Sequence, residues 1–181
     1  MLTSGFTGTE LRIVVRWEDW KFPHDDWEKG KIWSWRDNEP FKSNTRICPV
    51  TGRSTSTSAM HWTGYWDENP EMAAKWFKEN DMAVRYAHGD FDEVETVDNI
   101  VYMRCDLHRS IDCGELLVAQ KGSGIPFTLH ATAGKEAVGY VEDGYHGAIV
   151  EIPAGSAPFV FARFAFTTIE ILSRYKETHS N

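Results

Sequence analysis

Cysteine is scarce in this chain, which has only three, Cys48, Cys105 and Cys113, and no Cys-x-x-Cys pair. An odd number of cysteines without paired spacing argues against a disulfide framework and against a structural zinc site. The run His24-Asp25-Asp26 is interpreted as a solvated acidic loop, because no further ligand follows at metal-binding spacing. We therefore expect no metal centre.

A basic surplus and long apolar runs are also missing. Lys and Arg number 19 against 27 Asp and Glu, a net charge of −8, which disfavours a general polyanion binder but is compatible with a local basic groove. No stretch approaches the ~18 apolar residues of a membrane span, and the first residues lack the pattern of a secretory leader. The sequence predicts a soluble, cytoplasmic protein that binds neither membranes nor nucleic acids in general.

Apolar residues, by contrast, are plentiful. They make up 41% of the 181 residues, enough for the core of a globular domain. Tryptophan is distributed unevenly, because all eight copies lie in the first 76 residues: Trp17, Trp20, Trp27, Trp33, Trp35, Trp62, Trp66 and Trp76. We expect a Trp-rich region over residues 1–95 and a strand-rich region over 96–181, together forming one compact domain.

The Trp-rich region allows two interpretations. Basic residues lie among the aromatic ones, so the two kinds could form a path on which nucleobases stack; they are Arg36, Lys42, Arg46 and Arg53. Acidic residues are interleaved with them, however, and the region has few aliphatic side chains. We therefore favour a packing role for the tryptophans, which would hold a loop-rich region together.

Hydrophobic spacing predicts one clear helix and several strands. Pro70 followed by Met72, Trp76 and Phe77 on one face predicts a helix over residues 71–80. Strands are expected over 11–17, 97–106, 127–132, 147–152, 159–164 and 167–172, short helices over 110–120 and 135–141, and loops over 18–58. The predicted fold class is α+β, with a strand-rich core of two small packed sheets and short helices.

An ordered series of short motifs begins near residue 99. The predicted strand Ile100-Val101-Tyr102-Met103-Arg104 ends in arginine, and Phe127-Thr128-Leu129-His130-Ala131-Thr132 ends in a small hydroxyl residue. A predicted helix follows, and the strand over 167–172 carries Glu170 before Ile-Leu. Over about residues 95–175, this order resembles the ADP-ribosyltransferases of the Arg–Ser–Glu type.

The resemblance implies a catalytic set and a substrate. Arg104 would position the pyrophosphate or ribose of NAD through charge-assisted hydrogen bonds. Thr132 would order the site, and Glu170 would stabilise the oxocarbenium-like charge that develops when the nicotinamide–ribose bond breaks. The implied function is NAD-dependent ADP-ribosyl transfer to a macromolecular acceptor, expected to be a protein, with NAD as substrate and no metal.

The resemblance also implies further NAD-binding residues and shows two departures. Tyr140 or Tyr145 would stack on nicotinamide, and His130 would join Arg104 and Thr132 around the dinucleotide. His130, however, replaces the first hydroxyl of the family's Ser-Thr-Ser strand. Members that modify arginine usually carry a second Glu two residues before the catalytic one, and this chain has Thr168 there. Arginine is therefore not the expected acceptor.

Structural interpretations stand beside these roles. Arg104 could form a local ion pair with Asp98 or Asp106, Thr132 could cap a helix, and Glu170 could face solvent. The alternative function is a non-catalytic β-rich interaction or assembly protein, for example a viral or phage structural component. A third candidate is a nucleotide-binding barrel, because residues 140–147 resemble the substrate loop of dUTP-hydrolysing enzymes.

Overall fold

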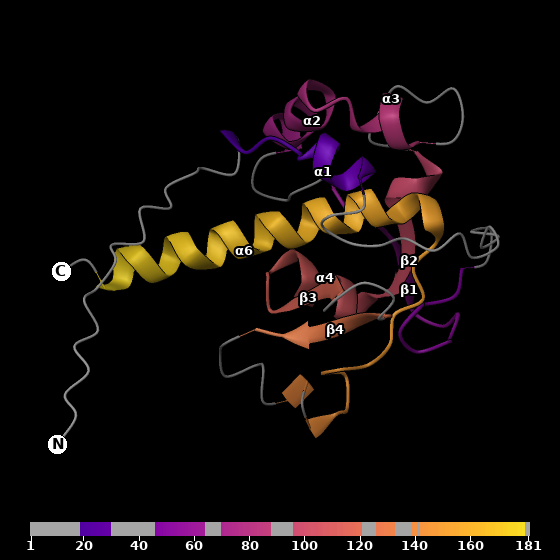
Figure 1. Ribbon diagram of the computed structural model, residues 1–181. Coiled ribbons are helices and arrows are strands. Elements are labelled where there is room, and N and C mark those ends of the chain that lie inside the picture. Colours follow the sequence, from indigo (N-terminus) through magenta and orange to yellow (C-terminus); the bar gives the residue numbers. More distant parts are fainter. Residues whose placement is uncertain are drawn as a thin grey trace, which may run out of the picture.

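Two antiparallel strand pairs and one long helix organise the computed structural model (Figure 1). The structure describes residues 19–29, 46–63, 70–87, 96–120, 126–132, 139–140 and 142–179. The first pair joins β1 (Thr57–His61) to β2 (Ile100–Arg104), and the second joins β3 (Leu116–Gln120) to β4 (Phe127–Ala131). The α+β class predicted from the sequence is confirmed, with two small sheets.

The described helices differ greatly in length. They are α1 (His24–Glu28), α2 (Pro70–Glu79), α3 (Met82–Tyr86), α4 (Cys105–Asp112) and α6 (Ala157–His179), with short 3-10 turns at Val97–Asn99 and Ala154–Ser156. The predicted helix over 71–80 is confirmed as α2, and its buried face carries Trp76 and Phe77 as expected. Among the described residues, no helix combines the length and apolar character needed to cross a membrane.

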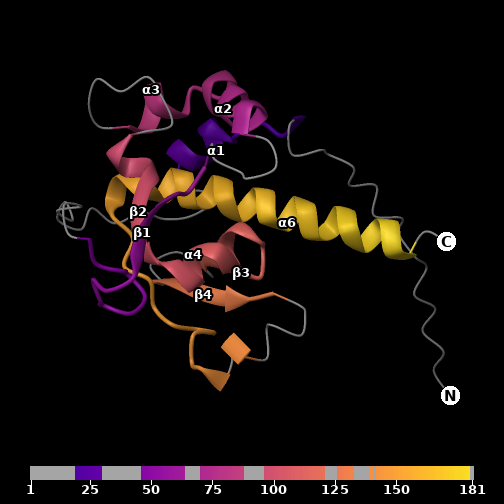
Figure 2. The same cartoon turned by 180° about the vertical axis from the view of Figure 1, so that it is seen from behind.

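The long C-terminal helix α6 corrects two predictions. Residues 159–164 and 167–172 were expected to be strands, and both lie inside this 23-residue helix. Its buried positions include Phe159, Arg163 and Phe166, and this spacing of three or four residues matches the helical period. Both views show α6 crossing the molecule above the β3–β4 pair, with the β1–β2 pair beside one of its ends (Figures 1 and 2). Alongside the short helices that were expected, the fold therefore contains one long helix.

Smaller corrections concern the segments that flank the strands. The helix expected over 110–120 is wrong, because α4 ends at Asp112 and Gly114, with φ at +70°, precedes strand β3. The strand expected over 97–106 is shorter than predicted, since α4 begins at Cys105. Instead of a strand, residues 147–152 contribute an isolated bridge between Ile149 and Thr128. The predicted strand over 11–17, with Trp17, and most of the helix over 135–141 lie outside the described residues.

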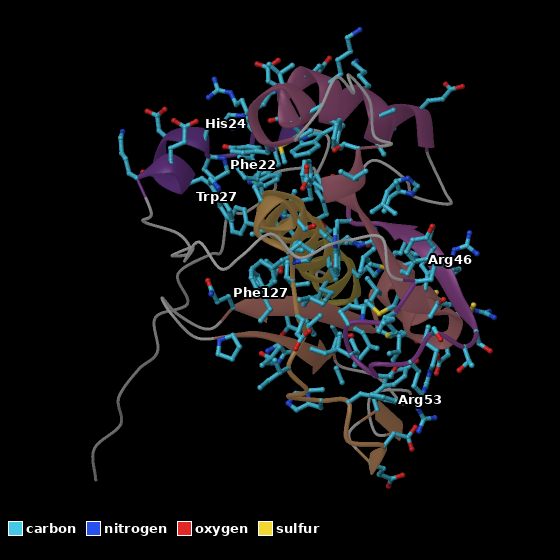
Figure 3. The ribbon with its side chains drawn as sticks, turned by 90° about the vertical axis from the view of Figure 1, so that its right-hand side faces the viewer. Phe22, His24, Trp27, Arg46, Arg53 and Phe127 are labelled. Atoms are coloured by element: carbon cyan, nitrogen blue, oxygen red, sulfur yellow. The ribbon has the colours of Figure 1, made fainter. Side chains whose placement is uncertain are left out.

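Aromatic rings fill the core between α2, α6 and the N-terminal segment. Trp62 and Trp76 are 0% and 2% exposed. Trp20 stacks on Trp76 with ring centroids 5.5 Å apart, and Phe166 meets Trp76 edge-on at 4.6 Å. Phe22, labelled in Figure 3 beside His24 and Trp27, extends this cluster. The packing interpretation of the tryptophans is confirmed for Trp62 and Trp76.

Candidate active site

Arg104 ends strand β2 and is engaged by a neighbouring carboxylate. Its Nε donates to Asp106 Oδ1 at 2.6 Å, and its Nη2 donates to the other carboxylate oxygen. These hydrogen bonds raise the pKa of Arg104 and lower the pKa of Asp106. The guanidinium carbon lies 5.2 Å from the centre of the Tyr145 ring. The structure thus contains the local ion pair with Asp106 that was the structural interpretation of this arginine.

Thr132 directly follows strand β4 and contacts the two residues that precede strand β3. Its hydroxyl donates to the backbone oxygens of Gly114 at 2.9 Å and Glu115 at 3.1 Å. The Glu115 carboxylate in turn accepts a 3.0 Å hydrogen bond from the Tyr140 hydroxyl, which also meets the hydroxyl of Ser110. Burial is the main cause that raises the pKa of Tyr140. Thr132 and Tyr140 are therefore linked through Glu115.

His130 belongs to a pair of imidazoles beside β4. Its Nε2 lies 2.7 Å from the Thr128 hydroxyl, and its ring centre lies 5.4 Å from that of His146. His146 accepts a 3.2 Å hydrogen bond from the backbone nitrogen of Ala131. Backbone bonding also joins Tyr145 to Tyr140 at 2.9 Å. Five predicted site residues are thus joined in one network of contacts, in part through the backbone and through Glu115 and His146: Arg104, His130, Thr132, Tyr140 and Tyr145.

Among the described contacts of Glu170, none joins it to this network. It is exposed on α6, where it pairs with Arg174 one turn later, rather than on a strand. Arg104 and Gly114, the partner of Thr132, flank the two ends of α4, whose eight residues span about 12 Å at the usual helical rise. Among the described contacts, none joins Arg104, Thr132 and Glu170 directly. The three predicted catalytic residues do not converge on one hydrogen-bonding position.

A different set of side chains forms a continuous hydrogen-bonded relay. The Ser58 hydroxyl lies 2.7 Å from His108 Nδ1, and His108 Nε2 lies 2.9 Å from Asp112 Oδ2. One neutral tautomer satisfies both contacts, with Nε2–H donating to the carboxylate and Nδ1 accepting from the hydroxyl. This is the order of nucleophile, base and orienting acid found in serine-dependent acyl transfer.

The acid of this relay is fixed from the opposite side. Arg163 of α6 is 5% exposed, and its Nη2 donates to Asp112 Oδ1 at 2.9 Å and to the Ile111 backbone oxygen at 2.9 Å. Asp112 therefore uses one oxygen for Arg163 and the other for His108. Because the arginine is held in the core, it restricts the carboxylate, and through it the imidazole, to one orientation.

The local fold explains why these residues meet. His108 and Asp112 are four positions apart, so they share one flank of α4. Ser58 is two residues before the buried Met60 on β1, so both side chains point to the core face of the strand, where α4 packs. Ser56, with φ at +55°, accepts a 2.9 Å hydrogen bond from the Cys105 nitrogen, which ties the start of β1 to the start of α4.

The relay is also open to solvent. The side chains of His108 and Asp112 are 25% and 27% exposed, respectively, so small molecules in solution can approach the imidazole. Arg163, which holds Asp112, is buried in the core, whereas His108 lies nearer the surface. The arrangement can activate the Ser58 hydroxyl by removing its proton.

Sequence reasoning missed this set, although one signal was present. His108-x-x-x-Asp112 is the spacing of two residues on one helical flank. The sequence, however, predicts a strand over 97–106 and a helix over 110–120, so the two residues are not expected on one helix. Ser58 lies at the end of a Ser/Thr run that was interpreted as loop. Its partner is 50 residues away in the sequence, and no local pattern connects the two.

Comparisons of the chain with protein-family models, with curated proteins and with solved structures found no match. The functional assignment therefore depends on geometry and chemistry alone, and by that measure the Ser58–His108–Asp112 relay is the leading candidate for a catalytic centre.

Proposed function

We propose that this chain is a serine-dependent acyl hydrolase that acts on small, activated esters. The observation that carries the proposal is the 2.7 Å contact between Ser58 and His108, with His108 held by Asp112 at 2.9 Å. A nucleophile within hydrogen-bond reach of a base that is itself oriented by a third group is the diagnostic arrangement for nucleophilic catalysis. Esters are the favoured class because an alcohol leaves more readily than an amine.

The proposed reaction proceeds in two balanced steps. Ser58 Oγ attacks the ester carbonyl carbon while its proton passes to His108 Nδ1. The tetrahedral intermediate then expels the alcohol, which takes that proton, and an acyl group remains on Ser58 Oγ. Water attacks the acyl carbon with its proton again passing to His108, and the carboxylic acid leaves as the serine regains its proton. Asp112 stabilises the imidazolium in both steps without becoming protonated.

A fluorophosphonate probe should label Ser58 in the full-length protein. The relay accounts for activation of the nucleophile but not for stabilisation of an oxyanion, so covalent labelling is a sharper readout than turnover. We expect Ser58→Ala to abolish labelling of the peptide that contains residue 58, and His108→Gln to slow it about 10²- to 10⁴-fold, the usual contribution of a general base. Mass spectrometry of the labelled peptide and the time course of labelling measure both effects.

Ser110→Ala is the matched control for this experiment. Ser110 lies on the same helix as His108, but its hydroxyl contacts Tyr140 rather than an imidazole. Labelling of this variant should equal that of the wild type. A wild-type protein that does not react with the probe, or a Ser58→Ala variant that reacts equally fast, would exclude the hydrolase.

NAD-dependent ADP-ribosyl transfer to a macromolecular acceptor, expected to be a protein, is a second candidate. Its support is the network of contacts that joins Arg104, His130, Thr132, Tyr140 and Tyr145, five of the residues for which the resemblance implied a role in NAD binding or catalysis. The carboxylate of Glu115 belongs to the same network, 3.0 Å from the Tyr140 hydroxyl, and is an acid available there, whereas Glu170 pairs with Arg174 on α6.

Arg104→Lys tests the transferase directly. Lysine keeps the charge but lacks the planar fork of arginine, so we expect NAD binding to weaken at least ~10-fold, or ~1.4 kcal/mol, with little change in melting temperature. Isothermal titration with NAD measures the affinity, and Arg174→Lys, an exposed arginine on α6, serves as control. If the wild type does not bind NAD at millimolar concentration, or if both proteins bind it equally, the transferase fails. Failure of both enzymatic proposals would leave the non-catalytic interaction or assembly role.

A further inference from the structure

We infer that the outer face of the β1–β2 pair binds single-stranded nucleic acid through two arginine–tyrosine stacks. Arg46 lies with its guanidinium carbon 5.7 Å from the centre of the Tyr102 ring, and that of Arg104 lies 5.2 Å from the Tyr145 ring. Tyr102 and Arg104 are two residues apart on β2, so they point to the same face of the strand. The two stacks therefore form a row along one face.

The segment before β1 brings basic residues along the edge of this strand pair. Thr57 lies opposite Arg104 in the strand register, and its hydroxyl donates to the Arg46 backbone oxygen at 3.4 Å. A turn closed by a 2.9 Å hydrogen bond from the Cys48 nitrogen to the Arg53 oxygen then presents Arg53. Figure 3 shows Arg46 and Arg53 along the same edge of the molecule.

Charge is distributed unevenly between this face and the rest of the chain. Arg46 and Arg53 are exposed, and within the described ranges no carboxylate lies in salt-bridge distance of either. Arg104 is already neutralised by Asp106. The face therefore offers two uncompensated guanidinium groups in a chain whose net charge is −8. This is the local basic patch that net charge alone left possible.

The combination of aromatic rings with arginine favours a single strand over other anionic partners. Bases of a single strand can stack on tyrosine rings and on guanidinium planes whatever their sequence, whereas the bases of a duplex are already stacked on each other. An acidic peptide would satisfy the arginines but has no planar groups for the rings. Two free arginines imply about two phosphate contacts, and therefore weak binding that salt readily disrupts.

Fluorescence anisotropy with a short labelled oligo(dT) tests this inference on the full-length protein. For two phosphate contacts, the logarithm of the association constant should fall with the logarithm of salt concentration at a slope of about −1.4, since each contact contributes about −0.7. Arg46→Gln should bring the slope to about −0.7. Tyr102→Leu should weaken binding about 5- to 150-fold through lost stacking while leaving the slope unchanged.

Two controls separate this face from the rest of the molecule. Arg85→Gln removes an exposed arginine on α3 that pairs with Glu28, and its binding should match that of the wild type. Ser58→Ala should also bind oligo(dT) like the wild type, because binding of the nucleic acid does not involve the hydrolytic relay. Circular dichroism of each variant establishes that a loss of binding is not a loss of fold.

Three results of the direct binding measurements would overturn the inference. They are absence of binding by the wild type at low salt, an equal loss of affinity in Arg85→Gln and Arg46→Gln, and equal or tighter binding of a duplex of the same length. Competition by a poly-glutamate peptide as effective as unlabelled oligo(dT) would also overturn it and would identify an acidic protein as the partner.

Discussion

Trp76→Ala is expected to lower the free energy of unfolding by about 3–5 kcal/mol, the range for truncating a large buried aromatic residue. The side chain is 2% exposed, and it packs against both Trp20 and Phe166. Its indole nitrogen also donates to the Trp20 backbone oxygen. The substitution leaves a cavity where α2, α6 and the N-terminal segment meet, and it leaves that oxygen without the indole donor.

Urea unfolding followed by circular dichroism measures the change in the free energy of unfolding. In thermal unfolding, the melting midpoint should fall by about 6–20 °C for a chain of this size. Trp76→Phe is the informative control, because it keeps most of the ring volume and loses the indole hydrogen bond. It should cost clearly less than Trp76→Ala. Equal stability of the wild type and the alanine variant would show that the aromatic cluster does not hold the two regions together.

Arg163→Met should be the second severe substitution. It removes the cation from a buried pair and leaves the Asp112 carboxylate facing a methionine side chain, where removal of one partner typically costs 3–5 kcal/mol. Asp112 keeps 27% of its side chain exposed, so we expect about 3 kcal/mol, the lower end of that range. The variant should also label more slowly with the fluorophosphonate probe, because Asp112 is no longer held in place.

A double variant separates loss of the ion pair from loss of packing. Asp112→Asn removes the charge that Arg163→Met leaves unpaired, so Arg163→Met with Asp112→Asn should be less destabilised than the sum of the two single variants. Thermal unfolding of the four proteins gives the coupling energy. Strict additivity would mean that Arg163 stabilises the protein through its aliphatic stem rather than its charge.

Some elements of the fold could be predicted because short-range signals agreed with the tertiary structure. Helix α2 begins at Pro70, and the spacing of Trp76 and Phe77 matches the face that is buried. Strand β4 combines β-favouring residues with a buried alternation of Phe127 and Leu129. In both segments the intrinsic propensity of the residues, the spacing of the apolar residues and the observed packing favour the same element. The local sequence is therefore sufficient to predict it.

Helix α6 shows where local reading fails. Phe159, Val160, Thr167 and Ile169 all favour strands by intrinsic preference, and the apolar content is too high for a clear amphipathic pattern. As a helix, the segment buries Phe159 and Phe166 against the aromatic residues of α2 and buries Arg163 against α4. These contacts favour the helix. Long-range packing here outweighs propensity, and it cannot be read from the segment itself.

The candidate active site was harder to predict than the fold. The residues from Arg104 to Tyr145 that the resemblance singled out are joined by contacts, whereas Glu170 lies on a helix and not on the expected strand. Ser58 and His108 come from elements far apart in the chain, and neither element was predicted in its observed extent. Their contact depends on the pairing of β1 with β2, which requires knowledge of the whole topology.

That pairing has a consequence for the order of folding. Only six residues separate β3 from β4, whereas 38 separate β1 from β2, and the entropy of closing a loop rises with its length. We expect the β3–β4 hairpin to form early and the β1–β2 pair late. Ser58 meets His108 only after the late step, so a partly folded chain would carry an inert serine, and reactivity toward the probe during refolding would appear together with the last native contacts.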